Sequence, residues 1–224
     1  MCLRLRFWWY LLIALLCLSS ARALVAEMPF IEIDPGSRTA FRERGTGRPV
    51  VMVGVNYFDH ETGWAPKLWQ KFDEARVRRQ LEMLHEQGFN AIRVFLTYQS
   101  FHVEPGRVHP EGEAKLRKLI RMCRELGIYV MPTGPDHWEG TPKWRTGDRF
   151  ADETLLTADE AWWREFAERF KDEPALWAYD LYNEPMIGWD SPAMKAKWND
   201  WLKRQYGSVE KIAKAWKRPA DQVG

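Results

Sequence analysis

The chain has 224 residues, of which 46% are hydrophobic and 29% charged, and its formal net charge is +2. This near-neutral balance, without a basic stripe, argues against a nucleic-acid partner or an anionic membrane surface. The length suits one domain, and no low-complexity linker or change of composition marks a second one.

The N-terminal segment has the pattern of a secretory signal peptide. A basic start precedes an apolar run over residues 7–18, and a small-x-small motif ends at Ala23, after which we expect cleavage. Twelve apolar residues are too few to span a bilayer core of about 30 Å comfortably. We therefore divide the chain into a signal peptide, 1–23, and a mature part, 24–224. The mature part is expected to be secreted (extracellular or periplasmic), without a membrane partner.

Cleavage changes both the charge and the cysteine content. Three arginines leave with the signal and no acid does, so 30 basic residues face 31 acidic ones. Cys123 is then the single cysteine, which excludes an internal disulfide and predicts a core that is stable without one. We expect Cys123 itself to be a buried small hydrophobe on a helix.

Strands and helices alternate along the mature chain. Strands are predicted at 38–43, 50–55, 89–96, 128–131 and 176–182, and helices at 73–87, 111–126, from the capping-box sequence 157–160 onwards, and at 192–206 and 208–217. The first two strands form a hairpin around Gly45 and Gly47. The run 50–55 is continuously apolar, which is typical of a strand buried on both faces.

This alternation predicts right-handed βα units on a parallel sheet. Because the loops after the strands are long and those before them short, we expect a (β/α)₈ TIM barrel with its chemistry at the carboxyl ends of the strands. A doubly wound sheet is the alternative, but no Gly-x-Gly-x-x-Gly follows the first strand. Four units fill the mature chain, so we expect about the first four units of the barrel, its N-terminal part.

One carboxylate is singled out by its place at the end of a predicted strand. Residues 176–182 are apolar or aromatic enough for a buried strand, and Asn183-Glu184-Pro185 stops it. Proline cannot donate to a sheet ladder and favours an extended residue before it. Glu184 is therefore a candidate acid or base held by a scaffold, and the alternative is a solvated carboxylate at a strand end.

Three motifs resemble strands one, two and four of the clan A glycoside hydrolases. They are Gly-Val-Asn-Tyr-Phe at 54–58, Gly-Phe-Asn-Ala-Ile-Arg-Val at 88–94 and Tyr-Asn-Glu-Pro at 182–185. The group they resemble most is the cellulase- and mannanase-like family five, over about residues 38–190. The stretch from Trp201 to Trp216 is also similar to clan A β-galactosidases, so the family within the clan stays open.

The resemblance implies roles for three residues. Glu184 would be the general acid/base of a retaining mechanism, which needs a pKa raised towards neutrality. Asn183 would hydrogen-bond the 2-hydroxyl of the sugar, and Arg93 would orient and ionise the nucleophile. An arginine inside an apolar strand is costly unless paired, so a purely structural pair of Arg93 with Asp180 is the alternative.

Further candidates lie in the loops after the strands. His137 stands where the family often has a substrate-binding histidine, and a surface-loop histidine is the alternative. Aromatic candidates for contact with a β-linked carbohydrate are Trp138, Trp144, Trp189 and Tyr57. The histidines fit no metal-ligand spacing, so we predict no metal site and no cofactor.

The second carboxylate of the mechanism is not assigned. The resemblance places the nucleophile at the end of strand seven, which this chain lacks. Asp180 sits too deep, and nothing fixes the loop acids Glu139 and Asp190 at a cleft. We therefore expect negligible retaining activity from residues 24–224 alone.

The sequence thus predicts a secreted retaining glycoside hydrolase that cleaves O-glycosyl bonds of a β-linked poly- or oligosaccharide. A non-catalytic carbohydrate-binding remnant of such a barrel and a β-galactosidase-type member of the clan are the alternatives. A metal-dependent barrel hydrolase is disfavoured, because no paired histidines follow the first strand.

Overall fold

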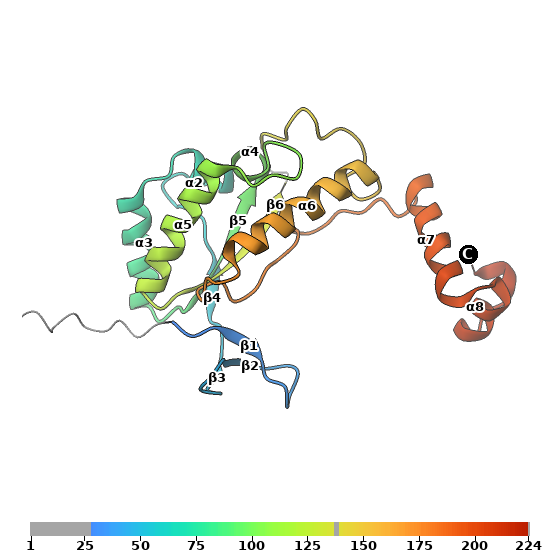
Figure 1. Ribbon diagram of the computed structural model, residues 1–224, viewed down its shortest axis with the longest axis horizontal. Coiled ribbons are helices and arrows are strands. Elements are labelled where there is room, and N and C mark those ends of the chain that lie inside the picture. The colour runs from blue at the N-terminus through green and yellow to red at the C-terminus, as the bar shows by residue number, and fades with distance from the viewer. Residues whose placement is uncertain (1–27, 137–138, 224) are drawn as a thin grey trace, which may run out of the picture.

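A computed structural model describes residues 28–136 and 139–223, so the predicted signal peptide, His137 and Trp138 lie outside the described residues. Two sheets are present (Figure 1). The antiparallel sheet has the order β1-β2-β3, and the parallel sheet has the order β4-β5-β6. Their bounds are β1 (Ile31–Ile33), β2 (Phe41–Glu43), β3 (Pro49–Val50), β4 (Gly54–Asn56), β5 (Ala91–Thr97) and β6 (Tyr129–Asp136).

Helices follow the parallel strands, as the sequence predicts. They are α2 (Ala65–Gln70), α3 (Glu74–Glu86), α4 (Tyr98–Phe101), α5 (Pro110–Glu125), α6 (Glu153–Phe170), α7 (Pro192–Tyr206), α8 (Val209–Trp216) and the short 3₁₀ helix η1 (Ala220–Gln222). Helices α3, α5 and α6 cover one face of the parallel sheet (Figure 1), where apolar side chains of strands and helices form one buried core. Cys123 is part of that core, as expected, and burial raises the pKa of its thiol.

The antiparallel sheet lies at the end of the parallel sheet where its strands begin (Figure 1). The ring of Phe41 meets Trp177 edge-on at 5.2 Å, and the Tyr129 hydroxyl donates to the Pro29 carbonyl at 2.9 Å. These contacts attach the predicted hairpin to the N-terminal ends of the parallel strands.

The predicted strand 50–55 is wrong in its extent and burial. Only its first residue, Val50, pairs with β2, and its last residues begin the other sheet. Between them, Val51 and Val53 are 75% and 51% exposed. β4 has a single neighbour, β5, among the described strands. An edge position therefore replaces the two-sided burial that the apolar run predicts.

The predicted fourth strand is also less regular than its sequence indicates. Residues 176–180 meet β6 through two isolated parallel bridges, Val130 with Leu176 and Thr133 with Asp180. The side chains of Tyr179 and Leu181 are 41% and 59% exposed. Because no described strand lies on its outer side, this segment has one partner and its ladder is interrupted.

Helix α6 begins earlier than the capping-box sequence predicts. Asp152 is the N-cap, and its side chain accepts hydrogen bonds from the amides of Thr154 and Leu155. The predicted start at Thr157 lies inside the helix. On this helix Trp162 is fully buried, whereas its neighbour Trp163 is only half buried.

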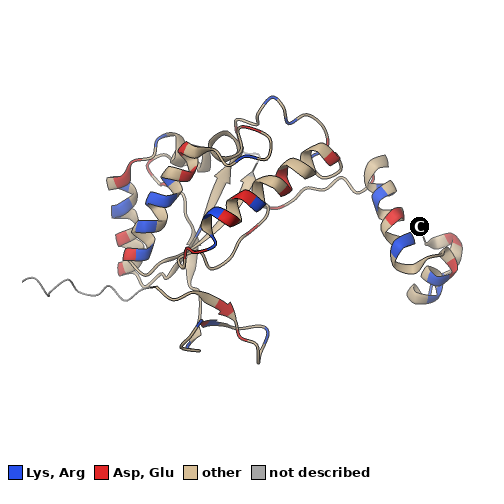
Figure 2. Cartoon of the chain, in the orientation of Figure 1, with Lys and Arg blue, Asp and Glu red and all other residues tan. Residues whose placement is uncertain are grey.

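Helices α7 and α8 form a second, smaller cluster around Leu202, Ile212 and Val223, set apart from the sheet in Figure 1. Ser208 caps α8 as predicted, accepting from the amide of Lys211. Lys and Arg are interspersed with Asp and Glu on the outer faces of α3, α5 and α6 (Figure 2). In the described part of the chain, no helix is long and apolar enough to cross a membrane.

Candidate active site

Arg93 is the centre of a polar network on the inner face of the parallel sheet, opposite the helices. Its Nε donates to Asp180 Oδ2 at 3.0 Å, and its Nη2 contacts the same carboxylate. Nη2 also donates to Asn183 Oδ1 at 3.1 Å. The guanidinium lies 4.5 Å from the centroid of the Phe95 ring. These partners offset the cost of placing an arginine within an apolar strand.

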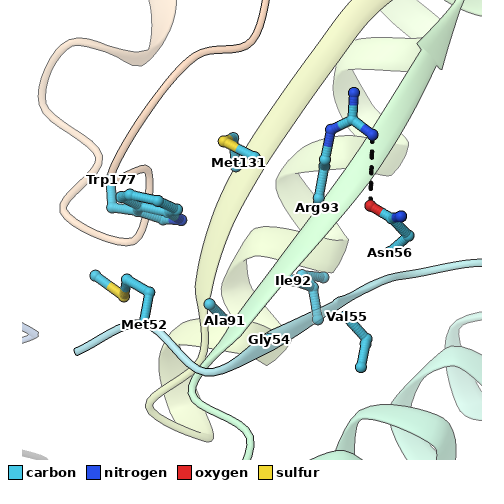
Figure 3. A pocket seen from close by; sticks show the side chains of 9 residues that line it. All are labelled: Met52, Gly54, Val55, Asn56, Ala91, Ile92, Arg93, Met131 and Trp177. Carbon is cyan, nitrogen blue, oxygen red and sulfur yellow. Dashed lines mark hydrogen bonds between the residues drawn. The ribbon is translucent and has the colours of Figure 1, made fainter. Parts of the chain in front are cut away.

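Four consecutive sheet segments contribute to this network. Asp180 accepts a further hydrogen bond from Thr133 Oγ1 of β6 at 3.0 Å, and Arg93 Nη1 donates to Asn56 Oδ1 of β4 at 3.4 Å (Figure 3). The structural pair of Arg93 with Asp180 is therefore present, and the same guanidinium also holds Asn183. That Arg93 orients a nucleophile stays a prediction.

Glu184 follows directly on this network. Its side chain is exposed, and the structure shows it without a hydrogen bond or ion pair to any described residue. Its backbone has φ of +43°, which is uncommon for a residue other than glycine and is retained where the surroundings enforce it. Asn183 before it is half buried, and Pro185 after it removes a backbone donor.

The directions of the side chains at 180–183 differ from those of an ideal strand. Strict alternation places Asp180 and Tyr182 on one face. Instead Asp180 and Asn183 both reach Arg93, while the Tyr182 hydroxyl donates to Asp159 of α6. The reason is that sheet pairing stops at Asp180, so beyond it side-chain hydrogen bonds decide the direction of the chain.

An open hollow of about 310 Å³ lies beside Arg93 at the inner face of the sheet (Figure 3). Its lining comes from β4, β5, β6 and the fourth segment: Met52, Gly54, Val55, Asn56, Ala91, Ile92, Arg93, Met131 and Trp177. A Cβ at Gly54 would stand 2.4 Å from the carbonyl oxygen of Ala91, so glycine is required for the close approach of β4 to β5. Sequence reasoning missed Asn56 and Met131 here, although strand alternation places both on the face of Arg93.

The other sequence candidates are distributed around the fold. Tyr57 is 4% exposed, and its hydroxyl donates to Gln80 Oε1 of α3 at 2.6 Å, so we leave it out of the proposed site. Trp144 is half buried and donates from Nε1 to the Val103 carbonyl at 2.7 Å. Trp189 is 63% exposed. The candidates His137 and Trp138 lie outside the described residues.

Metal binding finds no support in the described residues. Within 28–136 and 139–223, no group of three or more His, Cys, Asp and Glu side chains gathers where it would hold a metal ion. The loop acids that the sequence leaves unassigned are exposed: Glu139, and Asp190, which faces Lys195 at 3.8 Å.

Comparison with known proteins found a matching family model and two relatives. A family model described as Cellulase (glycosyl hydrolase family 5) matches residues 45–220. A "Beta-galactosidase" of Vibrio cholerae serotype O1 is 28% identical over 156 residues, which cover 66% of this chain and 12% of that protein. "Beta-galactosidase 2" of Enterobacter cloacae is 27% identical over 158 residues, which cover 70% and 13%. The chain thus spans a small fraction of the length of these relatives.

Solved structures share the fold at low sequence identity. The exo-β-1,4-mannosidase Op5Man5 from Opitutaceae bacterium strain TAV5 is 24% identical with a TM-score of 0.64, covering 82% of this chain and 32% of that one. A GH5_18 from Streptomyces cattleya in complex with GlcNAc is 24% identical with a TM-score of 0.56, covering 72% and 41%. A GH5_18 variant from Bifidobacterium longum subsp. longum, in complex with Manβ1-4GlcNAc, is 16% identical with a TM-score of 0.53, covering 70% and 40%. The βα units described above are therefore about the first four of a TIM barrel.

Proposed function

Because this chain belongs to the cellulase family of glycosyl hydrolases, family 5, we propose that it carries the acid/base half of a retaining glycosidase for a β-linked carbohydrate. The observation that supports this most is the bridge that Arg93 makes between Asp180 and Asn183. It fixes the residue before Glu184 at the carboxyl end of the sheet, where TIM-barrel enzymes have their catalytic groups.

Glu184 is the proposed proton donor. In the first step its carboxylic acid protonates the glycosidic oxygen as the bond to the anomeric carbon breaks and a second carboxylate bonds to that carbon. In the second step the Glu184 carboxylate takes a proton from water, whose oxygen displaces the second carboxylate with overall retention. The exposed Glu184 side chain, without an internal partner among the described residues, is free to meet a glycosidic oxygen.

Asn183 is the proposed contact to the sugar. Since its Oδ1 accepts from Arg93, its amide nitrogen is directed away from that guanidinium and keeps two N–H donors. One of them donates to the 2-hydroxyl oxygen of the sugar, an interaction that strengthens in the transition state. Arg93 therefore acts by orienting the asparagine amide, besides any effect on a nucleophile.

We place the nucleophile outside residues 1–224. Asp180 is committed to Arg93 and Thr133, and the exposed Glu139 and Asp190 have nothing to position them at about 5–5.5 Å from Glu184, as retention requires. The small share of the matched proteins that this chain covers supports the same proposal. The signal-peptide pattern of residues 1–23 supports secretion.

The substrate class has two candidates. The fold shared with enzymes described as an exo-β-1,4-mannosidase and as bound to Manβ1-4GlcNAc favours a β-mannoside. The two curated relatives named β-galactosidase favour a β-galactoside. Initial rates on matched aryl β-mannosides, β-galactosides and β-glucosides separate these candidates.

The test uses the protein from the complete reading frame that contains residues 24–224, together with residues 24–224 alone. The complete protein is expected to hydrolyse a β-glycoside with retention, and Glu184→Gln lowers kcat by about 10²–10⁴-fold. Glu160→Gln, at an exposed position of α6, is the control and keeps wild-type activity.

Two results would contradict the proposal. Robust turnover by residues 24–224, abolished by Glu184→Gln, would place both carboxylates within this chain. Oligosaccharide binding by the complete protein without hydrolysis of any β-glycoside would favour the non-catalytic carbohydrate-binding protein.

A further inference from the structure

A second polar network lies behind the candidate site, on the side of helix α6. Its centre is Asp159, which is 5% exposed. Asp159 Oδ1 and Oδ2 accept from Nη1 and Nη2 of Arg145 at 2.6 and 3.0 Å, and Oδ2 also accepts from the Tyr182 hydroxyl. A bidentate arginine pair is the geometry in which a buried carboxylate is best held.

The groups around this pair are buried as well. The Arg145 side chain is 3% exposed, and its guanidinium lies 4.1 Å from the centroid of the Tyr98 ring. His102 Nδ1 stands 3.5 Å from Asp159 Oδ1, while His102 Nε2 accepts from the Gly106 amide at 3.0 Å. The accepting Nε2 carries no proton, so His102 is neutral with its proton on Nδ1, facing the carboxylate.

Tyr182 connects this network to the candidate site. Its ring meets Phe150 edge-on at 5.5 Å. Burial, followed by the neighbouring Tyr98 and then Asp159, raises the pKa of its hydroxyl, which therefore stays a proton donor. The next residue, Asn183, is held from the opposite side by Arg93. Two adjacent side chains are thus fixed in different directions, which fixes the peptide unit that precedes Glu184.

This arrangement accounts for the backbone of Glu184. A positive φ at a glutamate costs free energy and persists only when neighbouring contacts impose it. Asn183 provides one such contact, the hydrogen bond that its Oδ1 accepts from Arg93 Nη2 at 3.1 Å. Tyr182 provides the second anchor, because its hydroxyl is bound to a carboxylate that Arg145 itself immobilises.

We propose that Tyr182, Asp159 and Arg145 are positioning residues that hold Glu184 in the orientation needed for proton donation. The inference rests on the proposed role of Glu184, and it concerns residues that touch neither the substrate nor the reacting atoms. Loss of the Tyr182 hydroxyl releases the peptide before Glu184, while Arg93, Asp180 and the sugar contact of Asn183 remain in place.

The activity test uses the complete protein with two substrates that share a glycone and differ in leaving group. A dinitrophenolate leaves without protonation, whereas the alcohol of an unactivated disaccharide needs the general acid. Tyr182→Phe and Asp159→Asn are expected to lower kcat/KM on the disaccharide by about 10-fold or more, with less than about a 3-fold change in kcat/KM on the dinitrophenyl glycoside, because kcat/KM reports the first step alone. Glu160→Gln, next to Asp159, is the control.

A second measurement does not depend on activity. Hydrogen exchange of the amides of Asp180 and Gly134, which donate to the carbonyls of Pro132 and Asp180, is expected to quicken by about 10-fold in Tyr182→Phe and to stay at the wild-type rate in Glu160→Gln. Amides of α5, remote from Tyr182, report whether the fold is intact.

The outcomes are distinct. An equal loss of kcat/KM on both substrates, or unchanged exchange at the amides of Gly134 and Asp180, would overturn the positioning role. Absence of any glycosidase activity in the wild-type protein would overturn the proposed function instead, and the exchange experiment would then decide the inference alone.

Discussion

Two networks hold residues 180–183, and they differ in how complete they are. The inner network, around Arg93 and Asp180, has side chains that are 20% and 28% exposed, and it opens on the hollow in Figure 3. The outer network, around Arg145 and Asp159, has side chains that are 3% and 7% exposed. The outer network is thus sealed by this chain alone, whereas the inner one still faces a space that a ligand or further chain can fill.

The two networks are expected to differ in their contributions to stability and to function. A bidentate ion pair closed off from water costs much when one partner is removed, because the other charge stays buried. In a partly exposed pair, the charge that stays behind keeps access to water when its partner is removed. Its loss should therefore lower ligand affinity more than the free energy of unfolding. The outer pair should therefore govern the free energy of unfolding, and the inner pair the binding and turnover of sugar.

The largest expected effect is that of Asp159→Ala. It leaves the Arg145 guanidinium buried without its carboxylate, which should lower the free energy of unfolding by about 3–5 kcal/mol. Urea denaturation of residues 24–224 measures this. The control, Glu160→Gln, removes an exposed ion pair with Arg164 and should cost less than about 0.5 kcal/mol. A loss below about 1 kcal/mol in Asp159→Ala would mean that the outer network is not the stable one.

The next effect is a pH dependence carried by His102. Burial lowers the pKa of this histidine from 6.5 to about 4, so between these values the unfolded chain binds a proton that the folded chain does not. Stability is therefore full above about pH 6.5 and falls as the pH falls, by about 2 kcal/mol at pH 5. Urea midpoints from pH 7.5 to pH 5 test this. His102→Gln should flatten the slope, and the exposed His60→Gln should leave it unchanged.

A smaller effect on stability is expected from Arg93→Lys in the inner network. An ammonium keeps the charge but cannot bridge Asp180 and Asn183 in the fork geometry of arginine. The free energy of unfolding should fall by about 1–2 kcal/mol, the value of one or two hydrogen bonds. The affinity of the complete protein for its oligosaccharide, measured by calorimetry, should fall by more than about 10-fold. A large loss of stability with unchanged affinity would reverse the comparison between the networks.

The smallest effect on the fold is expected from Trp189→Ala. Its indole is 63% exposed, so the free energy of unfolding should change by less than about 0.5 kcal/mol. If Trp189 stacks on a sugar ring, oligosaccharide affinity should fall by about 1 kcal/mol. Ile33→Ala, at an exposed position of the antiparallel sheet, controls for loss of apolar surface. Equal affinity in both variants would remove Trp189 from the proposed site.

Local patterns were sufficient for the βα units, whereas the roles of Asn183 and Glu184 rest on a family resemblance and stay predictions. The periodicity of α3 and α5 and the apolar runs of β5 and β6 are properties of short segments. The predicted bounds of α3, α5 and β5 agree with the structure within two residues, whereas β6 continues to Asp136, five residues beyond its predicted end at Met131. The same rules failed at 50–55 and 176–182, because burial of a strand depends on how many neighbours it has. A run of apolar residues does not say whether the strand is central or at an edge.

The sequence by itself determined that Arg93 needs a carboxylate and that no strand continues through Pro185. It offered Asp180 as the partner, and it gave no sign of the outer network, since Arg145, Asp159 and Tyr182 stand far apart in the chain. Only the tertiary structure decided that Tyr182 turns towards α6 while Asn183 turns towards Arg93. The physical reason is that pairing with β6 ends at Asp180. Beyond Asp180, hydrogen bonds to charged side chains of distant segments set the direction of the chain up to Glu184, and no local pattern encodes these bonds.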